Sequence, residues 1–239
     1  MLIYGINPVL EALRAGRVKS LRVSERAAGR AADVLKQAER AGIPVRRVQA
    51  SELDRAARGG VHQGIVAEIA DAAHVDISDL VSGARGVPLI VVLDGIEDPH
   101  NVGAILRTVD AAGADGVVRQ SRHAAALEGA AAKASAGAVS HVKIAEVVNI
   151  ARAIEELKEA GVWTVGLAGD APRRYDEVDL TLPTALVVGA EGDGLRRLVR
   201  ERCDWLVSIP MGGHVQSLNV SVATGIALFE ALRQRRASK

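Results

Sequence analysis

The sequence predicts an α/β protein in which a small N-terminal α/β domain precedes a larger domain with a parallel β-sheet. Short apolar strand patterns alternate with amphipathic helix patterns along the chain, as expected of a sheet with helical crossovers. Residues 89–93 form a continuous apolar run, which is typical of a strand covered by helices on both faces. The 239 residues are 49% hydrophobic but only 2% aromatic, so the core must consist of Val, Leu, Ile and Ala.

The first 70 residues carry the pattern of a compact α/β unit. Asn7 and Pro8 suit the cap and the first residue of a helix, which Gly16 then ends. A strand around Leu21 and Val23 follows. The remaining elements alternate in the same way, with a helix over 30–41, a strand over 45–48, a short helix from residue 51 and a strand over 64–69.

Residues 71–87 are predicted to be a linker with one short helical turn, because they contain three aspartates and two glycines at 83 and 86. We therefore expect one domain over 1–70 and a second over 88–239. The second domain should contain a helix over 101–112 that ends at Gly113, and another helix over 195–202. Its strands are expected at 89–93, 115–118, 142–146, 162–167, 184–188 and 205–209.

The charge is unevenly distributed between these two parts. Residues 1–70 hold 12 Lys and Arg against 7 Asp and Glu, a net charge of +5. Residues 71–239 hold 18 against 22, a net charge of −4. This pattern suits an N-terminal module that grips an RNA backbone for an enzyme domain, although ordinary solubilising surface charge produces it too.

The composition disfavours several classes of function. The single cysteine, Cys203, excludes an intramolecular disulfide and a cysteine metal cluster, and we expect a small, partly buried thiol there. Without a signal-peptide pattern or an apolar run of ~18 residues, we expect a cytoplasmic protein that does not associate with membranes. No metal is expected, because the histidines show no ligand spacing, although two of them lie near motifs described below and are candidates for RNA contact, His100 and His214. The other histidines are His62, His74, His123 and His141.

The most informative segment runs from Ile209 to Leu232. A short apolar strand end leads into a glycine-rich loop at Gly212 and Gly213, and a helix follows that Asn219 is placed to cap. Strand, glycine loop and helix in this order expose backbone N–H and C=O groups to a small ligand. The pattern predicts a pocket but leaves the ligand open.

Three segments resemble the signature motifs of the SpoU (TrmH) family of RNA 2'-O-ribose methyltransferases. Residues 101–107 resemble the first motif, N-x-G-x-x-x-R, residues 188–194 (VGAEGDG) the second, and residues 217–223 (SLNVSVA) the third. Residues 4–9 (YGINPV) and 64–67 (GIVA) are similar to the RNA-binding N-terminal domain of the family's 23S rRNA guanosine branch.

The resemblance implies a fold, a reaction and partners. The N-terminal RNA-binding domain is expected to be ribosomal-protein-like, and the catalytic domain to be a SPOUT domain with a C-terminal trefoil knot. The implied cofactor is S-adenosyl-L-methionine, the implied acceptor is the 2'-hydroxyl of a guanosine in 23S rRNA, and a homodimer is expected because the family's active site lies near a subunit interface. The residues that the resemblance assigns to cofactor binding are Gly189, Ile209, Leu218, Gly194 and Met211.

The resemblance also assigns five candidate catalytic residues. Arg107 is implied to activate the ribose hydroxyl; because arginine stays protonated, we expect it to stabilise the developing alkoxide and to clamp an RNA phosphate. Asn101 is expected to cap its helix and so to orient Arg107. Glu191 is expected to hold RNA or a catalytic side chain. Ser217 and Asn219 form the polar pair of the third motif, and Asn219 also suits a helix N-cap.

Other functions stay open at this point. Within the family, the substrate can instead be transfer RNA, or the enzyme can be an rRNA resistance methyltransferase. A non-catalytic RNA-binding or ribosome assembly protein is the alternative of another class. A Rossmann oxidoreductase is disfavoured, because Gly189, Gly192 and Gly194 have the spacing G-x-x-G-x-G late in the chain, whereas the dinucleotide fingerprint is G-x-G-x-x-G after the first strand.

Overall fold

The computed structural model describes residues 1–25, 27, 29, 31–70, 75–122, 124–127 and 129–237. The start of the predicted helix at residue 30, the start of the predicted linker at 71–74, and His123 lie outside these ranges, as does His74. No helix within the described ranges is long and apolar enough to cross a membrane. The chain forms two compact units, Met1–Ala73 with Val102–Arg107 and Ala126–His141, and His74–Asn101 with Thr108–Ala125 and Val142–Lys239.

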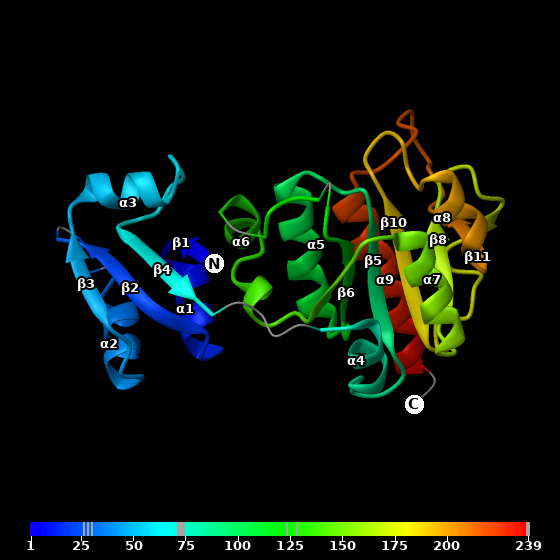
Figure 1. Cartoon of the computed structure of the whole chain (residues 1–239). Helices are drawn as coiled ribbons and strands as arrows, with labels where there is room; N and C mark the ends of the chain where they lie inside the picture. The colour runs from blue at the N-terminus through cyan, green and yellow to red at the C-terminus, as the bar shows by residue number, and fades with distance from the viewer. Residues whose placement is uncertain are drawn as a thin grey trace. The chain divides into compact units, whose positions relative to one another are not determined.

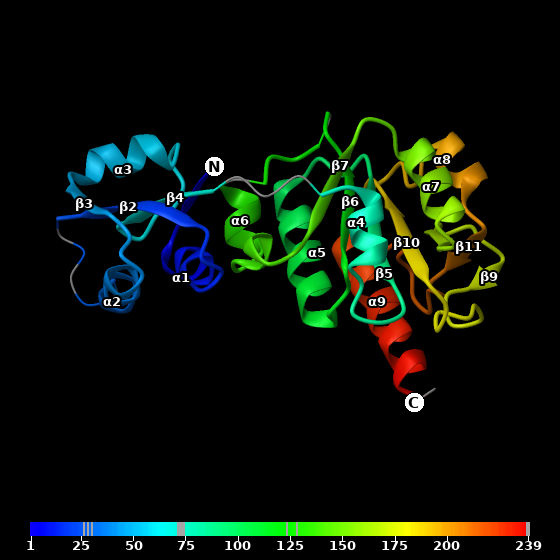
Figure 2. The ribbon, with the colours of Figure 1, turned by 60° about the horizontal axis from the view of Figure 1, so that its bottom comes forward.

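The first unit is built on a four-stranded mixed sheet with the strand order β1–β4–β2–β3. Strands β1 and β2 run antiparallel to β4, whereas β3 runs parallel to β2. Figures 1 and 2 show α3 on one face of this sheet and α1 and α2 on the other. The elements are β1 (Leu2–Tyr4), α1 (Ile6–Arg14), β2 (Val18–Ser24), α2 (Ala32–Arg40), β3 (Val45–Val48), α3 (Ala50–Ala56) and β4 (Ile65–Ile69).

A segment from later in the chain packs on this unit. It contains α6 (Ala130–Ala134) and the short 3-10 helix η1 (Ala138–Ser140). The guanidinium of Arg17 donates a hydrogen bond to the carbonyl of Val139 over 3.0 Å. Residues 126–141 fall in the range predicted for the catalytic domain, yet they lie against elements of the N-terminal sheet unit.

The second unit contains a seven-stranded parallel sheet with the order β7–β6–β5–β10–β8–β11–β9. Its central strand, β10, pairs with β5 on one side and with β8 on the other. The trefoil knot that the resemblance implies stays a prediction. The elements are α4 (Ile77–Ser82), β5 (Leu89–Asp94), α5 (Pro99–Ala112), β6 (Gly116–Gln120), β7 (Ile144–Val147), α7 (Ile150–Glu159), β8 (Trp163–Leu167), β9 (Arg173–Arg174), β10 (Thr184–Gly189), α8 (Arg197–Arg202), β11 (Trp205–Ser208) and α9 (Val220–Ala237).

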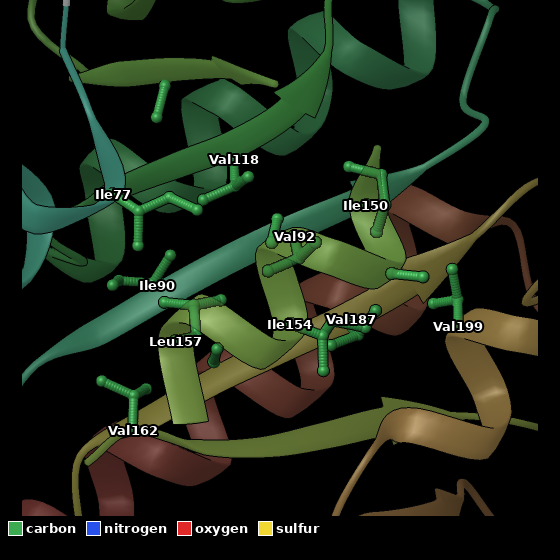
Figure 3. Packing of buried hydrophobic residues seen from close by; sticks show 14 of the residues in the cluster. Ile77, Ile90, Val92, Val118, Ile150, Ile154, Leu157, Val162, Val187 and Val199 are labelled. Atoms are coloured by element: carbon green, nitrogen blue, oxygen red, sulfur yellow. The ribbon is translucent and has the colours of Figure 1, made fainter. Parts of the chain in front are cut away.

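The core of the second unit is aliphatic, as its composition predicted. Figure 3 shows α7 in front of the strands and α9 behind them, so the sheet is covered on both faces. Ile154 and Leu157 of α7 pack on Val92 and Val187 of the strands, and all four are fully buried. The five aromatic side chains all lie at least partly at the surface, with Phe229 52% exposed.

Several element boundaries differ from the prediction. The first helix begins at Ile6, and Gly5 is its N-cap with a φ of 98°, so the prediction that Asn7 caps it is wrong. The unpredicted β1 explains the shift, because glycine can take the positive φ that turns the end of this strand directly into the helix. Strands β1 and β9 have only three and two residues, which is too short for a periodic pattern.

Part of the predicted linker belongs to the core. Its short helix, α4, buries Ile77 and Leu80 against Ile90 of β5 and Leu157 of α7. The helix carries a capping box, in which Asp76 and the Asp79 side chain satisfy each other's backbone N–H groups. Two of the aspartates that suggested a linker, Asp76 and Asp79, therefore begin the short helix that was expected within it.

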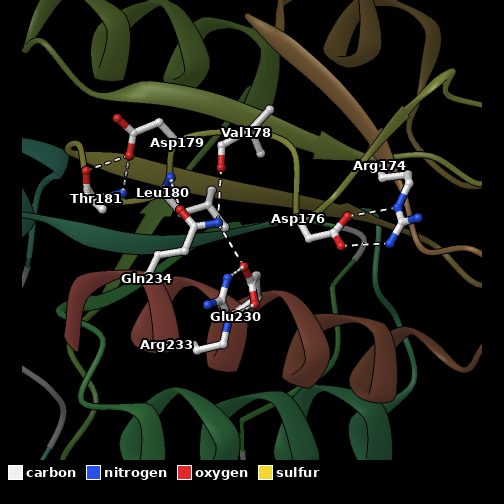
Figure 4. A network of polar contacts seen from close by, with 9 residues as sticks. All are labelled: Arg174, Asp176, Val178, Asp179, Leu180, Thr181, Glu230, Arg233 and Gln234. Atoms are coloured by element: carbon white, nitrogen blue, oxygen red, sulfur yellow. Dashed lines mark hydrogen bonds and ion pairs between the residues drawn. The ribbon is translucent and has the colours of Figure 1, made fainter. Parts of the chain in front are cut away.

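Polar contacts fix the C-terminal half of α9 to the segment that precedes β10 (Figure 4). Gln234 donates to the carbonyl of Val178 over 3.1 Å and accepts from the N–H of Leu180 over 2.9 Å. The next residue, Arg235, donates to the carbonyls of Leu180 and Pro88, each over 2.9 Å. These contacts hold α9 in place, and its first turn carries part of the third motif.

Candidate active site

A cavity of about 230 Å³ lies at the carboxyl ends of β8, β10 and β11. Ligands of parallel α/β sheets bind at this end, because the loops that leave the strands there surround an open space. The described residues that line it fall within 167–169, 188–194, 207–211 and 216–223. The predicted pocket therefore exists, and it also includes the end of β8, which no motif indicated.

A tight turn after β10 forms one wall of the cavity. A Cβ atom on Gly189 would lie 2.1 Å from the carbonyl group of Gly194, so only glycine fits where the chain folds back on itself. The N–H of Gly194 donates to the carbonyl of Ala190 over 2.9 Å and closes the turn. The turn places Glu191 at the cavity.

Hydrogen bonds connect one residue from each of the three motifs. The side-chain amide of Asn101 donates to Glu191 Oε2 over 3.2 Å. The side-chain amide of Asn219 donates to Asn101 Oδ1 over 2.9 Å and lies 3.4 Å from Glu191 Oε1. Asn101 is only 6% exposed, so its amide is held in one orientation by these partners.

All five residues assigned to cofactor binding line the cavity. Glu191 and Ser217, which are candidate catalytic residues, line the same cavity. Asn101 and Asn219 meet the cavity through their bonds to Glu191. The five are Gly189, Gly194, Ile209, Met211 and Leu218.

The helix that carries the first motif is capped differently from the prediction. Its N-cap is Asp98, whose carboxylate accepts the N–H of His100 over 2.9 Å, and Pro99 is its first residue. Asn101 is the third helical residue, so the expectation that it caps the helix is wrong. Asp98 followed by proline is the stronger start signal, and it frees the Asn101 side chain for Glu191. The helix ends at Gly113 as predicted.

Asn219 caps α9, which confirms that expectation. Its Oδ1 accepts the N–H of Ser221 over 2.9 Å and the Ser221 hydroxyl over 2.6 Å. The same side chain therefore uses its oxygen for the cap and its amide hydrogens for Asn101.

Arg107 lies exposed on α5, six residues after Asn101. Within the described part of the chain its guanidinium has no hydrogen bond or ion pair, and α5 fixes only its backbone. Six residues along a helix correspond to about 240° of rotation, so Arg107 and Asn101 project from different sides of α5. An unpaired exposed guanidinium is available to an anionic partner such as RNA.

Two charged residues at this end of the sheet fall outside all three motifs. Asp94, the last residue of β5, is fully buried and is bonded to Arg196, which follows the turn after β10. The only feature of the sequence that marks Asp94 is its position directly after the apolar run at 89–93.

The single cysteine is a partly buried thiol, as expected. Cys203 donates to the carbonyl of Val199 over 3.3 Å. Burial, with smaller contributions from the nearby carboxylates of Asp204 and Asp94, raises the pKa of this thiol to about 12. The thiol therefore stays protonated and does not act as a nucleophile at neutral pH.

Two described histidines pair with carboxylates in the first unit. His62 lies 3.0 Å from Asp54, and His141 lies 3.3 Å from Glu11. His100 and His214 are exposed near the first and third motifs. Among the described residues no group of three or more His, Cys, Asp or Glu side chains is placed to hold a metal ion.

Family models match nearly the whole chain. The model described as the SpoU rRNA Methylase family matches residues 88–229. A second model, described as RNA 2'-O ribose methyltransferase substrate binding, matches residues 2–75. The chain is also 45% identical over 239 residues to the 23S rRNA (guanosine-2'-O-)-methyltransferase RlmB of Pseudomonas aeruginosa, which covers 98% of this chain and 96% of that relative.

Solved structures give the same result. The SpoU methyltransferase AviRb from Streptomyces viridochromogenes, in complex with the cofactor AdoMet, superposes with a TM-score of 0.83 and 27% identity, covering 99% of this chain and 91% of that chain. The TrmH/SpoU tRNA modifying enzyme of A. aeolicus superposes with a TM-score of 0.58 and 36% identity, covering 65% of this chain and 79% of that chain.

Proposed function

The chain belongs to the SpoU rRNA methylase family, and we propose that it transfers a methyl group from S-adenosyl-L-methionine to the ribose 2'-hydroxyl of a guanosine in 23S rRNA. The observation that carries the proposal is the bonded set of Asn101, Glu191 and Asn219 beside one cavity. Three segments that resemble three motifs of one family meet there, although they are far apart in the sequence.

The cavity suits S-adenosyl-L-methionine better than a nucleotide with phosphate groups. Among the described residues that line it, Glu191 is the only one with an ionisable side chain, so no basic group is present to bind a phosphate. Ile209 and Leu218 supply an apolar wall for an adenine ring, and the turn at Gly189 lets the ligand approach backbone groups. When bound, this cofactor supplies a methyl group on a positively charged sulfur, next to which the carboxylate of Glu191 is favourable.

The protein's own task in this reaction is to position and polarise the ribose hydroxyl. The amides of Asn101 and Asn219 are oriented by Glu191, and the second hydrogen of Asn101 Nδ2 is a fixed donor for a ribose or phosphate oxygen. Ser217 adds a hydroxyl at the cavity wall. As the 2'-hydroxyl gives its proton to an adjacent RNA phosphate or to water, the guanidinium of Arg107 stabilises the negative charge that develops on the oxygen or clamps that phosphate.

The N-terminal unit favours ribosomal RNA as the substrate. Residues 1–70 carry a net charge of +5, and the substrate-binding model matches residues 2–75. The tRNA modifying enzyme of A. aeolicus covers only 65% of this chain, whereas the 23S rRNA enzyme of P. aeruginosa covers 98%. Transfer to tRNA is therefore the alternative that the experiment below must separate.

We also propose that the enzyme is a homodimer that associates through α9. Val222 and Phe229 are 50% and 52% exposed, and with the half-buried Ile226 they form an apolar stripe on this helix. A Cβ on Gly225 would lie 3.6 Å from Thr108 Cγ2, so α9 packs directly on α5 next to the position of Arg107. A second copy on this stripe would bring its own Arg107 to the neighbouring active site. Sedimentation of the wild type beside Phe229→Glu tests this, with a shift to monomer expected.

The experiment for the reaction is transfer of a labelled methyl group to unmodified large-subunit rRNA and, separately, to tRNA. Wild type should label a ribose 2'-oxygen of a guanosine in the rRNA. Arg107→Ala should reduce kcat about 100-fold, in the range of a lost charge-stabilising group. Arg152→Ala, an exposed arginine on α7, is the matched control and should retain full activity.

The outcomes separate the alternatives. Label in tRNA alone would support methyl transfer to a ribose 2'-hydroxyl but contradict 23S rRNA as the substrate. Absence of transfer to either RNA, together with absence of S-adenosyl-L-methionine binding, would contradict the enzyme and leave a non-catalytic RNA-binding protein.

A further inference from the structure

A fully buried carboxylate lies beneath the active-site turn. Asp94 ends β5 and is 0% exposed. Its Oδ2 accepts the backbone N–H of Arg196 over 2.8 Å, and its Oδ1 accepts Nε of the same arginine over 2.7 Å. A charge without solvent must be paired and hydrogen-bonded, and here both oxygens are satisfied by a single residue.

Arg196 stands at the point where the active-site turn ends. The turn leaves β10 at Gly189, passes Glu191 and closes with the bond from Gly194 to Ala190, after which Arg196 is the N-cap residue of α8. The side chain of Arg196 is 52% exposed, whereas that of Asp94 is 0% exposed, so the ion pair joins a buried carboxylate to a guanidinium at the surface. Because the backbone N–H is also bound, the contact fixes the path of the chain as well as the guanidinium.

Two side-chain hydrogen bonds connect the same two segments of the chain, 94–101 and 189–196. Asn101 bonds to Glu191 at the cavity, and Asp94 bonds to Arg196 below it. The β-ladder, in which Gly189 is the partner of Asp94, fixes the start of the turn. The turn is thus held at its start by the ladder, near its tip by Asn101 and at its end by Asp94.

We propose that Asp94 and Arg196 are positioning residues for methyl transfer, which set the shape of the turn at 190–195 and thereby the affinity for S-adenosyl-L-methionine. The proposal rests on the proposed function. Neither residue contacts the cavity; both act through the turn, whose backbone and Glu191 line it. Loss of the pair releases the end of the turn, and the cavity wall is then no longer preorganised.

The opposite end of β5 offers a matched control. Asp115 accepts the backbone N–H groups of Leu89 over 2.9 Å and Arg85 over 3.1 Å. Like Asp94, it is a carboxylate that accepts backbone N–H groups, but it does so at the amino end of β5, away from the cavity. A purely structural role of Asp94 predicts the same consequences for both aspartates.

The test measures S-adenosyl-L-methionine binding by calorimetry and thermal unfolding in the absence of RNA. Asp94→Asn keeps the shape of the side chain and removes its charge, and it should weaken cofactor binding about tenfold or more, as misplaced ligand-binding groups do. Asp115→Asn should lower the melting temperature but bind the cofactor within about twofold of wild type. In steady state, Asp94→Asn should raise KM for the cofactor and leave KM for RNA unchanged.

A second variant keeps the proposal testable if Asp94→Asn does not fold. Arg196→Lys keeps the backbone N–H and a cation for the buried carboxylate but loses the Nε–H donor, so it should fold and bind the cofactor about threefold or more weakly. Unchanged affinity in the folded variants, or an equal loss in Asp115→Asn, would overturn the positioning role alone. Absence of binding in the wild type would overturn the proposed function and this inference with it.

Discussion

The side-chain amide of Asn219 donates to Oδ1 of Asn101 over 2.9 Å, although 118 residues separate them in the chain. Glu191 accepts from both, so the three side chains form one hydrogen-bonded group. Both ends of the Asn101 amide and the amide nitrogen of Asn219 are bonded within this group, so the orientation of each amide is fixed before any ligand binds. Several consequences of this arrangement can be measured.

Asn101→Asp should make activity depend on pH in a way that the wild type does not. The new carboxylate would lie about 3 Å from Glu191, and two such groups cannot both ionise easily, so the pKa of one of them rises above its usual range. The pair is doubly charged above this raised pKa and shares a proton below it. We expect kcat to fall about 100-fold near pH 8 and to recover partly as the pH falls to about 6. Asn101→Ala should lose activity without that recovery.

Substitutions of Asn219 should separate its two roles. Serine at an N-cap accepts the N–H of Ser221 as asparagine does, whereas alanine does not, at a cost of about 1 kcal/mol. Alanine has no donor for Asn101, and the hydroxyl of serine is one bond closer to the backbone than the asparagine amide and should not reach Asn101 Oδ1. Asn219→Ser should therefore unfold at nearly the wild-type denaturant concentration and Asn219→Ala at a lower one, while both lose methyl transfer. If Asn219→Ser kept both stability and activity while Asn219→Ala lost both, the role of Asn219 as a donor to Asn101 would be contradicted.

Gly189→Ala should destroy the turn that forms the cavity wall. The added Cβ would lie 2.1 Å from the carbonyl of Gly194, so the strand end or the turn must move, at a cost of about 2 kcal/mol or more. Cofactor affinity, measured by calorimetry, should fall at least about tenfold. Gly86→Ala is the control, because its Cβ meets no atom within 4 Å, and it should change stability by less than about 0.5 kcal/mol.

Cys203 should reduce stability in alkaline solution. Its pKa is raised to about 12 in the folded protein from the ordinary 9.0, so the unfolded thiol ionises first as the pH rises. Stability from this group is fully present below pH 9 and is lost between about pH 9 and pH 12. Between about pH 8 and about pH 10.5, wild type should lose about 2 kcal/mol more unfolding free energy than Cys203→Ala. Equal losses in denaturant titrations would mean that the thiol ionises in the folded state.

The fold class and most strands were predictable because their signals are local. The apolar run at 89–93 is a strand buried on both faces, and β3 begins and ends at the predicted residues. Short strands were missed because β1 and β9 contain too few residues for a period. The helix α4 falls on the short helical turn expected within the linker. Its place in the core was not predicted, because its aspartates resemble loop residues and only packing against Ile90 reveals its buried side.

The site was predictable to the extent that its residues fall in motifs. The expected cofactor residues line one cavity, although contact with the ligand stays a prediction. The hydrogen bond between Asn101 and Glu191 could not be predicted from the sequence, because it depends on which helical position the asparagine occupies. The expected position was the N-cap, whereas Asp98 is the N-cap. Asp94 was missed for a related reason, since its partner follows 102 residues later.

The bond between Asn101 and Asn219 also determines when the site can exist during synthesis. Residues 94–101 and the turn at 190–195 emerge from the ribosome well before residue 219, and domains fold as their segments become available. Until Asn219 arrives, Asn101 Oδ1 lacks its donor and α9 lacks its cap. A chain that stops between residues 209 and 218 contains every strand of the parallel sheet but cannot hold the three side chains together. Methyl transfer therefore requires that translation has passed residue 219.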